Sequence, residues 1–324
     1  MMDIYFDFEN AIEIHKKKTS SEVIHDGIKA IKKHCTINFN FSKQDAFDDQ
    51  TMQFVIKGFT EGLGPNNKIN FCDEIIPDRP VKSNFHQAVP NKQSLFFING
   101  EIHNGQQAGS LIICNLGEEE ELFRKLMFFH NEYKLSKDLS IGSAEFDCWE
   151  KLNSFVHPFT DLIIFDKYLF NNDELTIESN YEKLLQQLHA GKNIKTNIII
   201  VTHPDNIHPT YDIISKTKEV VETLIGKKPN VTLLKYRTKP EHDRTIFTNY
   251  TRFKSGDSFN YFNNRNEKIS AGRELDLKCL IDSEYFSLAA KLISDLQLVV
   301  DDLQRINSDG IQGDKKSNFL KFAE

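Results

Sequence analysis

The residues with the clearest capacity for chemistry lie in one stretch of the C-terminal half, HDRTIFTNYTRFKSGDSFN. His242 and Arg244 are two positions apart, so on an extended strand both side chains point to the same face. Asn249, Gly256 and Asn260 follow at the spacing HxRx4Nx6GxxxN. A turn at Gly256 would bring Asn260 back beside the first two side chains. We therefore expect these side chains to share one pocket.

This spacing resembles the pattern HxKx4Dx6GSxxN of the phospholipase D superfamily, and it matches outright at His242, Gly256 and Asn260. In that family the histidine attacks a phosphodiester to form a phosphohistidine, the lysine and asparagine bind phosphate oxygens, and the aspartate orients the catalytic machinery. The resemblance implies that His242 is the catalytic residue. It also implies that Arg244, Asn249, Gly256 and Asn260 form the phosphate site, with no metal or other cofactor.

Two of the residues that define the family pattern are replaced. Arg244 stands in place of the lysine, and it keeps the charge and can bind phosphate through paired N–H donors, although it is larger and planar. Asn249 stands in place of the aspartate and carries no charge, as in some phosphodiesterases of the superfamily. The family also uses two such motifs, and His103 in EIHNGQQAGS is the nearest approach to a second one. One motif per chain could complete a site across a homodimer.

The triplet HDR also resembles phospholipase D-like C-terminal domains in which HDR replaces HKD, after a strand that ends in Asp, a basic residue and Tyr. Here these would be Asp166, Lys167 and Tyr168. Such domains are regarded as non-catalytic binding modules, and similar proteins occur near bacterial mobile-element and defence genes. We therefore expect a phosphate-binding or phosphodiester-binding module with weak or absent turnover, and nucleic acid is a candidate partner.

Three other interpretations stay open at this point. The first is an active metal-independent nuclease or phosphodiesterase assembled as a homodimer. The second is a non-enzymatic subunit of a larger protein complex. The third assigns no ligand at all, because a His-Asp-Arg triplet can fix a hairpin through surface hydrogen bonds.

Other polar residues have weaker signals. Asp7 and Glu9 in YFDFEN resemble an acidic strand end of a metal-dependent nuclease, although solvent-facing acids on an edge strand explain them as well. His203 and His208 could hold a metal with a nearby acid, but histidines beside prolines are more often turn residues. The run Glu118–Glu121 fits the start of a helix, where acidic groups favour the positive end of the dipole.

Composition limits the class of protein. The net charge of −7 argues against a surface that coats nucleic acid, although residues 227–254 are rich in Lys and Arg. The five cysteines are scattered and form no CxxC pair, which is typical of reduced thiols in a cytoplasmic protein. The apolar runs are much shorter than the roughly 20 residues of a membrane span, and the N-terminus is acidic where a secretory signal is basic. We expect no membrane insertion.

The elements that must position these residues indicate an α/β fold. From about residue 155, short β-branched runs alternate with helical stretches, which predicts a mixed or mostly parallel sheet flanked by helices, as in a phospholipase D-like domain. Two strands at Thr245–Thr248 and Ser258–Phe262 are predicted to follow. We expect an N-terminal α/β region at 1–150, for which a diverged first half is one interpretation, this domain at 151–308, and a flexible tail at 309–324.

In the N-terminal region the patterns predict strands at residues 2–8, 36–41, 94–98 and 110–114, helices at 23–33, 45–59 and 118–133, and a hairpin turn at Asn99 and Gly100. Near the C-terminus, apolar residues at helical spacing predict a helix over 283–306. Its apolar stripe fits packing within the protein, or alternatively a partner or dimer surface.

Overall fold

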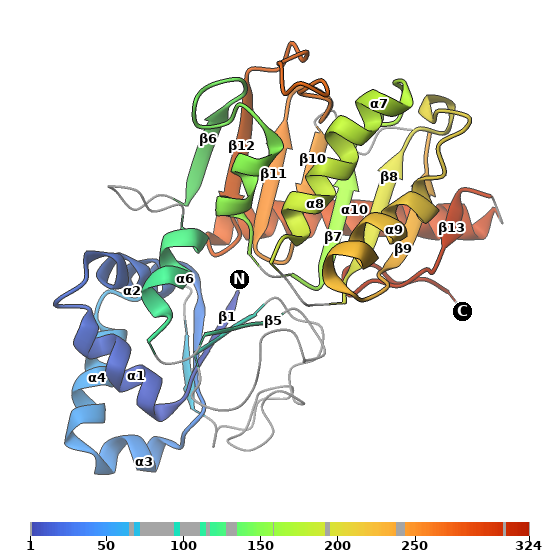
Figure 1. Cartoon of the computed structure of the whole chain (residues 1–324). Helices are drawn as coiled ribbons and strands as arrows, with labels where there is room; N and C mark the ends of the chain where they lie inside the picture. The colour runs from blue at the N-terminus through green and yellow to red at the C-terminus, as the bar shows by residue number, and fades with distance from the viewer. Residues whose placement is uncertain are drawn as a thin grey trace. The chain divides into compact units, whose positions relative to one another are not determined.

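The computed structural model describes residues 2–64, 68–71, 94–97, 111–114, 117–127, 135–157, 159–191, 195–237, 244–306 and 309–323. It forms two compact units (Figure 1). Unit 1 comprises Met1–Leu135 and Cys279–Ser287, and unit 2 comprises Ser136–Lys278 and Leu288–Glu324. Both units combine helices with a sheet, so the α/β prediction is confirmed. The division differs from the expected boundary at residue 150, because strand β6 (Ser136–Ser140) pairs within the sheet of unit 2.

Among the described residues, unit 1 has a five-stranded sheet in the order β3-β2-β1-β4-β5, and its paired strands all run parallel. Strand β1 (Asp3–Phe6) is the central strand, so the explanation of Asp7 and Glu9 as part of an edge strand is wrong. The expected helix over 45–59 is interrupted at Asp49, whose side chain caps the second of two helices. The remaining elements are β2 (Thr36–Phe39), β3 (Ile69–Phe71), β4 (Ser94–Phe97), β5 (Leu111–Cys114), α1 (Phe8–Lys17), α2 (Glu22–His34), α3 (Lys43–Asp48), α4 (Gln50–Thr60) and α6 (Glu119–Leu126).

Phenylalanines form the core of unit 1. Phe6 stacks on Phe97 with ring centres 4.7 Å apart, so the two central neighbouring strands are joined through their side chains. Phe39 contacts Phe59 edge to face at 5.6 Å, which joins β2 to α4. These four side chains are almost completely buried, and burial of such large apolar groups is the main stabilising contribution of a core.

The predicted hairpin at Asn99 and Gly100 lies outside the described residues, and β4 pairs in parallel with β5.

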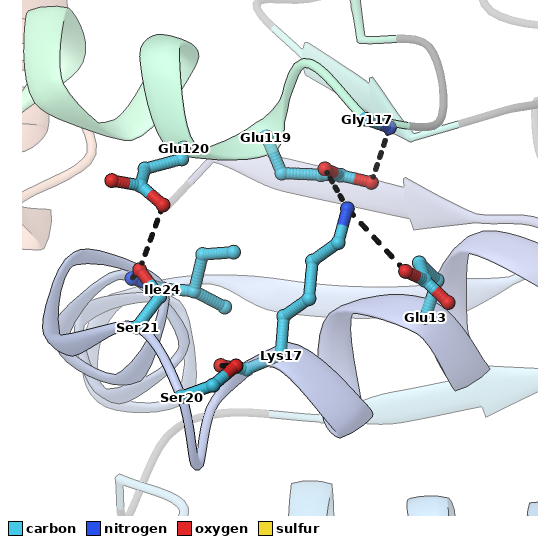
Figure 2. Close-up of polar contacts among 8 residues, drawn as sticks. All are labelled: Glu13, Lys17, Ser20, Ser21, Ile24, Gly117, Glu119 and Glu120. Atoms are coloured by element: carbon cyan, nitrogen blue, oxygen red, sulfur yellow. Dashed lines mark hydrogen bonds and ion pairs between the residues drawn. The ribbon is translucent and has the colours of Figure 1, made fainter.

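A buried carboxylate connects α6 to α1 (Figure 2). Glu119 has a side chain only 1% exposed, and it accepts a hydrogen bond from Lys17 at 3.1 Å and another from the backbone N–H of Gly117 at 3.0 Å. Burial alone would lower the pKa of Lys17, but the hydrogen bond and charge of Glu119, together with Glu13, outweigh it and raise that pKa. The acidic run therefore begins a helix, as expected, and also fixes that helix in the unit.

Helix α6 also packs closely on α2 at a glycine. A Cβ at Gly27 would lie 2.7 Å from the ring of Phe123, which is too short for a normal contact. Phe123 is fully buried and its ring centre is 5.6 Å from that of Phe97, so it has little room to move. The glycine is needed for the close approach of the two helices.

We predict that Gly27→Ala destabilises unit 1. Alanine favours a helix by about 1 kcal/mol over glycine, whereas overpacking against a fixed ring costs about 1–3 kcal/mol, so the net effect should be a loss. Phe123→Leu in the same chain should recover part of this loss by making room for the new methyl group. A double-mutant cycle measured by urea unfolding checks this, and additive effects of the two substitutions would contradict it.

Among the described residues, unit 2 has an eight-stranded sheet in the order β13-β9-β8-β7-β10-β11-β12-β6. Strands β7, β8 and β9 are parallel, and β7 pairs with β10 in the antiparallel direction. Figure 1 shows α7, α8 and α9 on one face of this sheet and α10 on the other. The bounds are β7 (Asp161–Phe165), β8 (Asn197–Thr202), β9 (Asn230–Lys235), β10 (Arg244–Phe247), β11 (Thr251–Ser255), β12 (Glu274–Cys279), β13 (Ile311–Gly313), α7 (Glu174–Ile177), α8 (Lys183–His189), α9 (Ile213–Ile225) and α10 (Ser283–Arg305).

This arrangement confirms the expected βαβ units and the C-terminal helix. Along α10 the buried residues include Ala289, Leu296, Val299, Val300 and Leu303. The described strands give no sign of a duplicated half, because the sheet of unit 1 is parallel in the order 3-2-1-4-5 and that of unit 2 is mixed. Among the described residues, no helix combines the length and apolar character needed to cross a bilayer.

The strand predicted at Ser258–Phe262 is wrong. Strand β10 turns at Thr248–Tyr250 and pairs antiparallel with Thr251–Ser255, which is β11. The segment after β11 is held by side chains instead of a strand partner: Asn180 accepts from the N–H of Phe262 at 2.9 Å and donates to its carbonyl at 2.7 Å. Backbone groups that are bonded to side chains in this way do not need a ladder.

The flexible tail expected at 309–324 is also wrong for the described residues. Residues Ile311–Gly313 pair with β9 as strand β13. Beyond this strand, Asn318 donates to the carboxylate of Asp161 through its backbone N–H and its side chain, both at 2.7 Å. Leu320 is 2% exposed. A polar segment can thus be ordered by hydrogen bonds that composition does not reveal.

Residues Cys279–Ser287 complete unit 1. Cys279 and Ile281 are fully buried, and the thiol of Cys35 lies 3.9 Å from the carbonyl of Ile281. The ring of His34 hydrogen-bonds to the hydroxyl of Ser283 at 3.2 Å. The unit is therefore built from two separate parts of the sequence.

Candidate functional site

Arg244, the first described residue of the motif stretch, begins β10 next to the end of β7. These strands are antiparallel, with Thr245 opposite Phe165, so Arg244 lies beside Asp166 at the same edge of the sheet. His242, the expected catalytic residue, lies outside the described residues, as does His103. The described site is therefore built from Arg244 onward.

Arg244 is held by contacts on two sides. Its Nη1 donates to the carbonyl of Gly256 at 2.9 Å, and its Cζ lies 5.4 Å from the ring centre of Tyr168. A guanidinium over an aromatic face gains cation–π attraction, so the ring helps to fix the plane of the arginine. The guanidinium has five N–H donors, and Gly256 accepts one of them. Gly256 therefore contributes through its carbonyl oxygen, and a Cβ at this position would meet nothing within 4 Å.

Asp166 organises the loops around Arg244. Its carboxylate accepts from the N–H of Tyr168 at 2.9 Å, from the hydroxyl of Ser258 at 2.8 Å and from the N–H of Phe259 at 2.8 Å. Burial raises the pKa of Asp166, whereas these donors and the positive charge of Arg244 oppose the rise. One carboxylate thus ties the loop after β7 to the loop after β11.

Asn260 lies at the same edge of the sheet, and its amide serves the loop. Its Nδ2 donates to the carbonyls of Tyr168 at 3.2 Å and Leu169 at 3.4 Å, and to the hydroxyl of Ser258 at 3.2 Å. Its Oδ1 is buried and has no hydrogen-bond partner among the residues described. The amide would have to rotate to present an N–H group to a ligand.

Asn249 lies at the opposite end of β10, away from Arg244 and Asn260. It is fully buried, and its Oδ1 accepts from the backbone N–H groups of Thr160 at 2.7 Å and Asp161 at 3.2 Å, where β7 begins. The structure therefore gives Asn249 a bracing position and does not bring it to the expected phosphate site around Arg244. The family pattern has an aspartate at this position. An aspartate oxygen could accept the same two backbone hydrogen bonds that Asn249 accepts here.

We predict that Asn249→Ala lowers the stability of unit 2 by about 1–3 kcal/mol, because two buried N–H groups lose their acceptor. Binding at Arg244 should stay unchanged in the folded protein. Urea unfolding and phosphate binding measured on the same samples test both statements. Asn264→Ala, at an exposed position of the same unit, is the matched control. Loss of binding without loss of stability would contradict the bracing role.

A second prediction concerns the pH dependence of stability. The folded-state pKa of Asp166 is raised, so the native protein holds a proton there more tightly than the unfolded chain does. This contribution is largest at low pH and is lost as the pH rises through the raised pKa. Relative to Asp166→Asn, the wild-type chain should therefore gain unfolding free energy as the pH falls from about 7 to about 4.

Asp173→Asn gives the matched comparison of opposite sign. The N–H and hydroxyl of Thr176 lower the pKa of Asp173, so its contribution is present above its unfolded pKa and is lost at low pH. Asparagine retains the helix cap. Unfolding curves at several pH values should therefore slope in opposite directions for the two variants. A common slope would show that Asp166 is not the cause.

Sequence reasoning found some of these partners and missed others. Asp166 and Tyr168 were identified through the family resemblance, and both contribute directly to the arrangement around Arg244. Ser258 was placed only at the start of a predicted strand, although its hydroxyl donates to the carboxylate of Asp166. Asn180 lies in a helix, 82 residues before Phe262, whose backbone it holds. No local sequence signal indicated this contact.

The histidines after β8 act as turn residues. His203 accepts from the N–H of Asp205 at 3.2 Å and caps a short 3-10 turn. His208 lies 3.1 Å from the hydroxyl of Thr210 and 3.9 Å from the carboxylate of Glu174. In the described part of the chain, no three His, Cys, Asp or Glu side chains form a metal-binding group.

Asp7 lies at a second position that is typical of ligand sites. It follows the central strand β1, from which neighbouring strands continue in opposite directions, and α/β proteins bind ligands outside the carboxyl ends of strands at such a switch point. Its Oδ1 accepts from the backbone N–H of Asn10 at 2.8 Å and from its side chain at 3.0 Å, which caps α1. Glu9 is exposed on the first turn of that helix.

Comparison with known proteins gives low similarity. No family model matches the sequence, and no curated protein matches it. Among solved structures, the chain is similar to TrmBL2, described as an archaeal chromatin protein that shows a novel mode of DNA binding, with 13% identity and a TM-score of 0.28. It is also weakly similar to phosphatidylserine synthase from Haemophilus influenzae Rd KW20, with 16% identity and a TM-score of 0.32.

These alignments cover 58% and 63% of this chain. They cover 60% of the TrmBL2 chain and 47% of the synthase chain, so this chain spans less than two thirds of either protein. The functions proposed below therefore depend on the geometry of the residues and not on these similarities.

Proposed function

We propose that unit 2 binds a phosphate or phosphodiester group beside Arg244, with weak or absent turnover. The observation that supports this is the fixed guanidinium of Arg244, held by the Gly256 carbonyl and the Tyr168 ring at an edge where several loops meet. An arginine in a fixed plane loses little entropy when it binds an oxyanion through two parallel N–H groups. Nucleic acid is the phosphodiester that the HDR resemblance suggests, in a bacterial defence or mobile-element setting.

Weak turnover follows from how the partner residues are used. The N–H groups of Asn260 are engaged by Tyr168, Leu169 and Ser258, so they are not directed at a bound phosphate. Asn249 is at the far end of its strand and contributes no group to the reaction. His242 would be the nucleophile of a working site, and it would need a general acid from elsewhere, such as a second copy of this chain.

Binding is tested with Arg244→Gln, Arg244→Lys and the control Arg265→Gln, which removes an exposed arginine of the same unit. The probe is a fluorescent single-stranded DNA with a 5′-phosphate. Arg244→Gln should weaken binding by about tenfold, since a hydrogen bond to a charged group is lost. Arg244→Lys should retain part of the affinity because it keeps the charge, and the control should match the wild type. Equal affinity for all four proteins would reject the site.

Turnover is tested by incubating the purified chain with single-stranded DNA, RNA and a chromogenic phosphodiester in EDTA, with His242→Ala beside it. Little or no cleavage is expected. Metal-independent cleavage that disappears in His242→Ala would instead establish an active phosphodiesterase, for which a homodimeric site is the leading arrangement. If the chain shows no binding and no cleavage, the result would favour a protein-interaction subunit.

The position of Asp7 supports a second candidate, a phosphodiesterase site in unit 1 that uses a divalent cation. Mg²⁺ and Mn²⁺ favour carboxylate oxygens, and Mg²⁺ is usually held by one or two carboxylates together with substrate phosphates. Asp7→Asn removes the charge and retains the cap of α1, because Asn caps a helix as well as Asp does. Cleavage that requires Mg²⁺ or Mn²⁺ and is lost in Asp7→Asn, but persists in His242→Ala, would assign the activity to unit 1.

A further inference from the structure

Three basic side chains of unit 1 converge on Gly58 in α4. Lys32 of α2 donates from Nζ to the carbonyl of Gly58 at 2.9 Å. If Gly58 carried a Cβ, that atom would lie 3.0 Å from Nζ of Lys18 and would collide with the ring of His15. Lys18 ends α1, and His15 lies one turn before it. Two ammonium groups and an imidazole are thus gathered around one residue without a side chain.

In the part of the chain that the structure describes, an acidic charge near Lys32 comes from an exposed carboxylate. Glu61 is the acidic group whose charge acts on Lys32, and its side chain is 67% exposed and 3.8 Å from a different cation, Lys57. Burial lowers the pKa of His15, and the charges of Lys18 and Lys32 lower it further. Burial and the charge of Lys18 likewise lower the pKa of Lys32. These directions are those expected when like charges crowd together in a partly buried place.

Cations at helix C-termini provide the ordinary explanation for such residues, because the last carbonyls of a helix attract positive charge. This accounts for Lys32, which bonds to a carbonyl in the last turn of α4. Lys18 and His15 lie at the C-terminal end of α1, where the same attraction applies, but that attraction does not supply a counter-ion. Both side chains are half-buried, and within the described ranges neither has a hydrogen-bond or ion-pair partner. An anion from solution would supply the counter-ion that the described residues do not provide for these two side chains.

We propose that His15, Lys18 and Lys32 form a binding site for a phosphate oxyanion, with the missing side chain of Gly58 allowing the His15 ring and Nζ of Lys18 to come close to α4. The oxyanion could be free phosphate or a phosphate of a nucleic-acid backbone, since both offer the same acceptor oxygens to ammonium and imidazole donors. All three residues belong to unit 1, whereas Arg244 belongs to unit 2. The inference is therefore independent of the function proposed for unit 2.

The experiment uses the full chain. Inorganic phosphate is titrated while the His15 imidazole is followed by NMR, with His15→Gln to assign the signal. A single-stranded oligonucleotide without a terminal phosphate is then measured by fluorescence anisotropy. The test variants are Lys18→Gln and the double variant Lys18→Gln/Lys32→Gln. The matched control is Lys16→Gln/Lys29→Gln, which removes two exposed lysines from the same helices and changes the net charge equally.

Phosphate should shift the His15 signal and raise its pKa, and the double variant should weaken binding by about tenfold while the control binds like the wild type. Lys18→Gln retains the Lys32 bond to Gly58. If this single variant also weakens phosphate binding, by less than the double variant does, then misfolding is excluded as the cause. A response to phosphate alone identifies a small anion as the ligand, and a response to the oligonucleotide alone identifies a nucleic-acid backbone. An unmoved His15 signal together with equal binding by test and control variants would overturn the proposal.

Discussion

The candidate site in unit 2 depends on the buried carboxylate of Asp166. Three donors from two loops end on it, so the chain after β7 and the chain after β11 cannot move apart without leaving a buried charge unsatisfied. Tyr168 and Asn260 take their positions from these loops, and Tyr168 in turn lies against Arg244. Arg244 offsets part of the unfavourable burial of the carboxylate through its charge. The cation that would meet a ligand is thus also part of what keeps the site together.

Sequence periodicity was informative where burial decides the structure. The alternating runs and helices after residue 155 predicted the parallel core of unit 2, because strands buried on both faces read as continuous apolar segments. It failed at Ser258–Phe262, where side chains of Asp166 and Asn180 replace a strand partner. It failed again at the C-terminal tail, where Asn318 bonds to Asp161. Contacts between residues far apart in sequence leave no local pattern to read.

The residues of the motif do not all lie in one place in the structure. The motif hypothesis placed four side chains in one pocket, with Gly256 at the turn, yet Arg244 and Asn249 are at opposite ends of the same strand. The spacing of a family motif can therefore combine residues that face a ligand with residues that hold the strand. Asp7 shows the reverse case: its surroundings in sequence suggested an edge strand, and only the strand order reveals its central position. Topology cannot be derived from the alternation of residues within one strand.

The discontinuity of unit 1 has a consequence for synthesis on the ribosome. Cys279 and Ile281 are fully buried there, yet they are translated only after the first segment of unit 2, Ser136–Lys278, has been made. The phenylalanine-rich sheet emerges first and cannot complete its core until these residues arrive. During this interval its apolar surface is exposed in a way that favours aggregation, and nascent domains in such a state are the ones that chaperones retain. Folding of unit 1 is thus coupled in time to translation of the segment Cys279–Ser287.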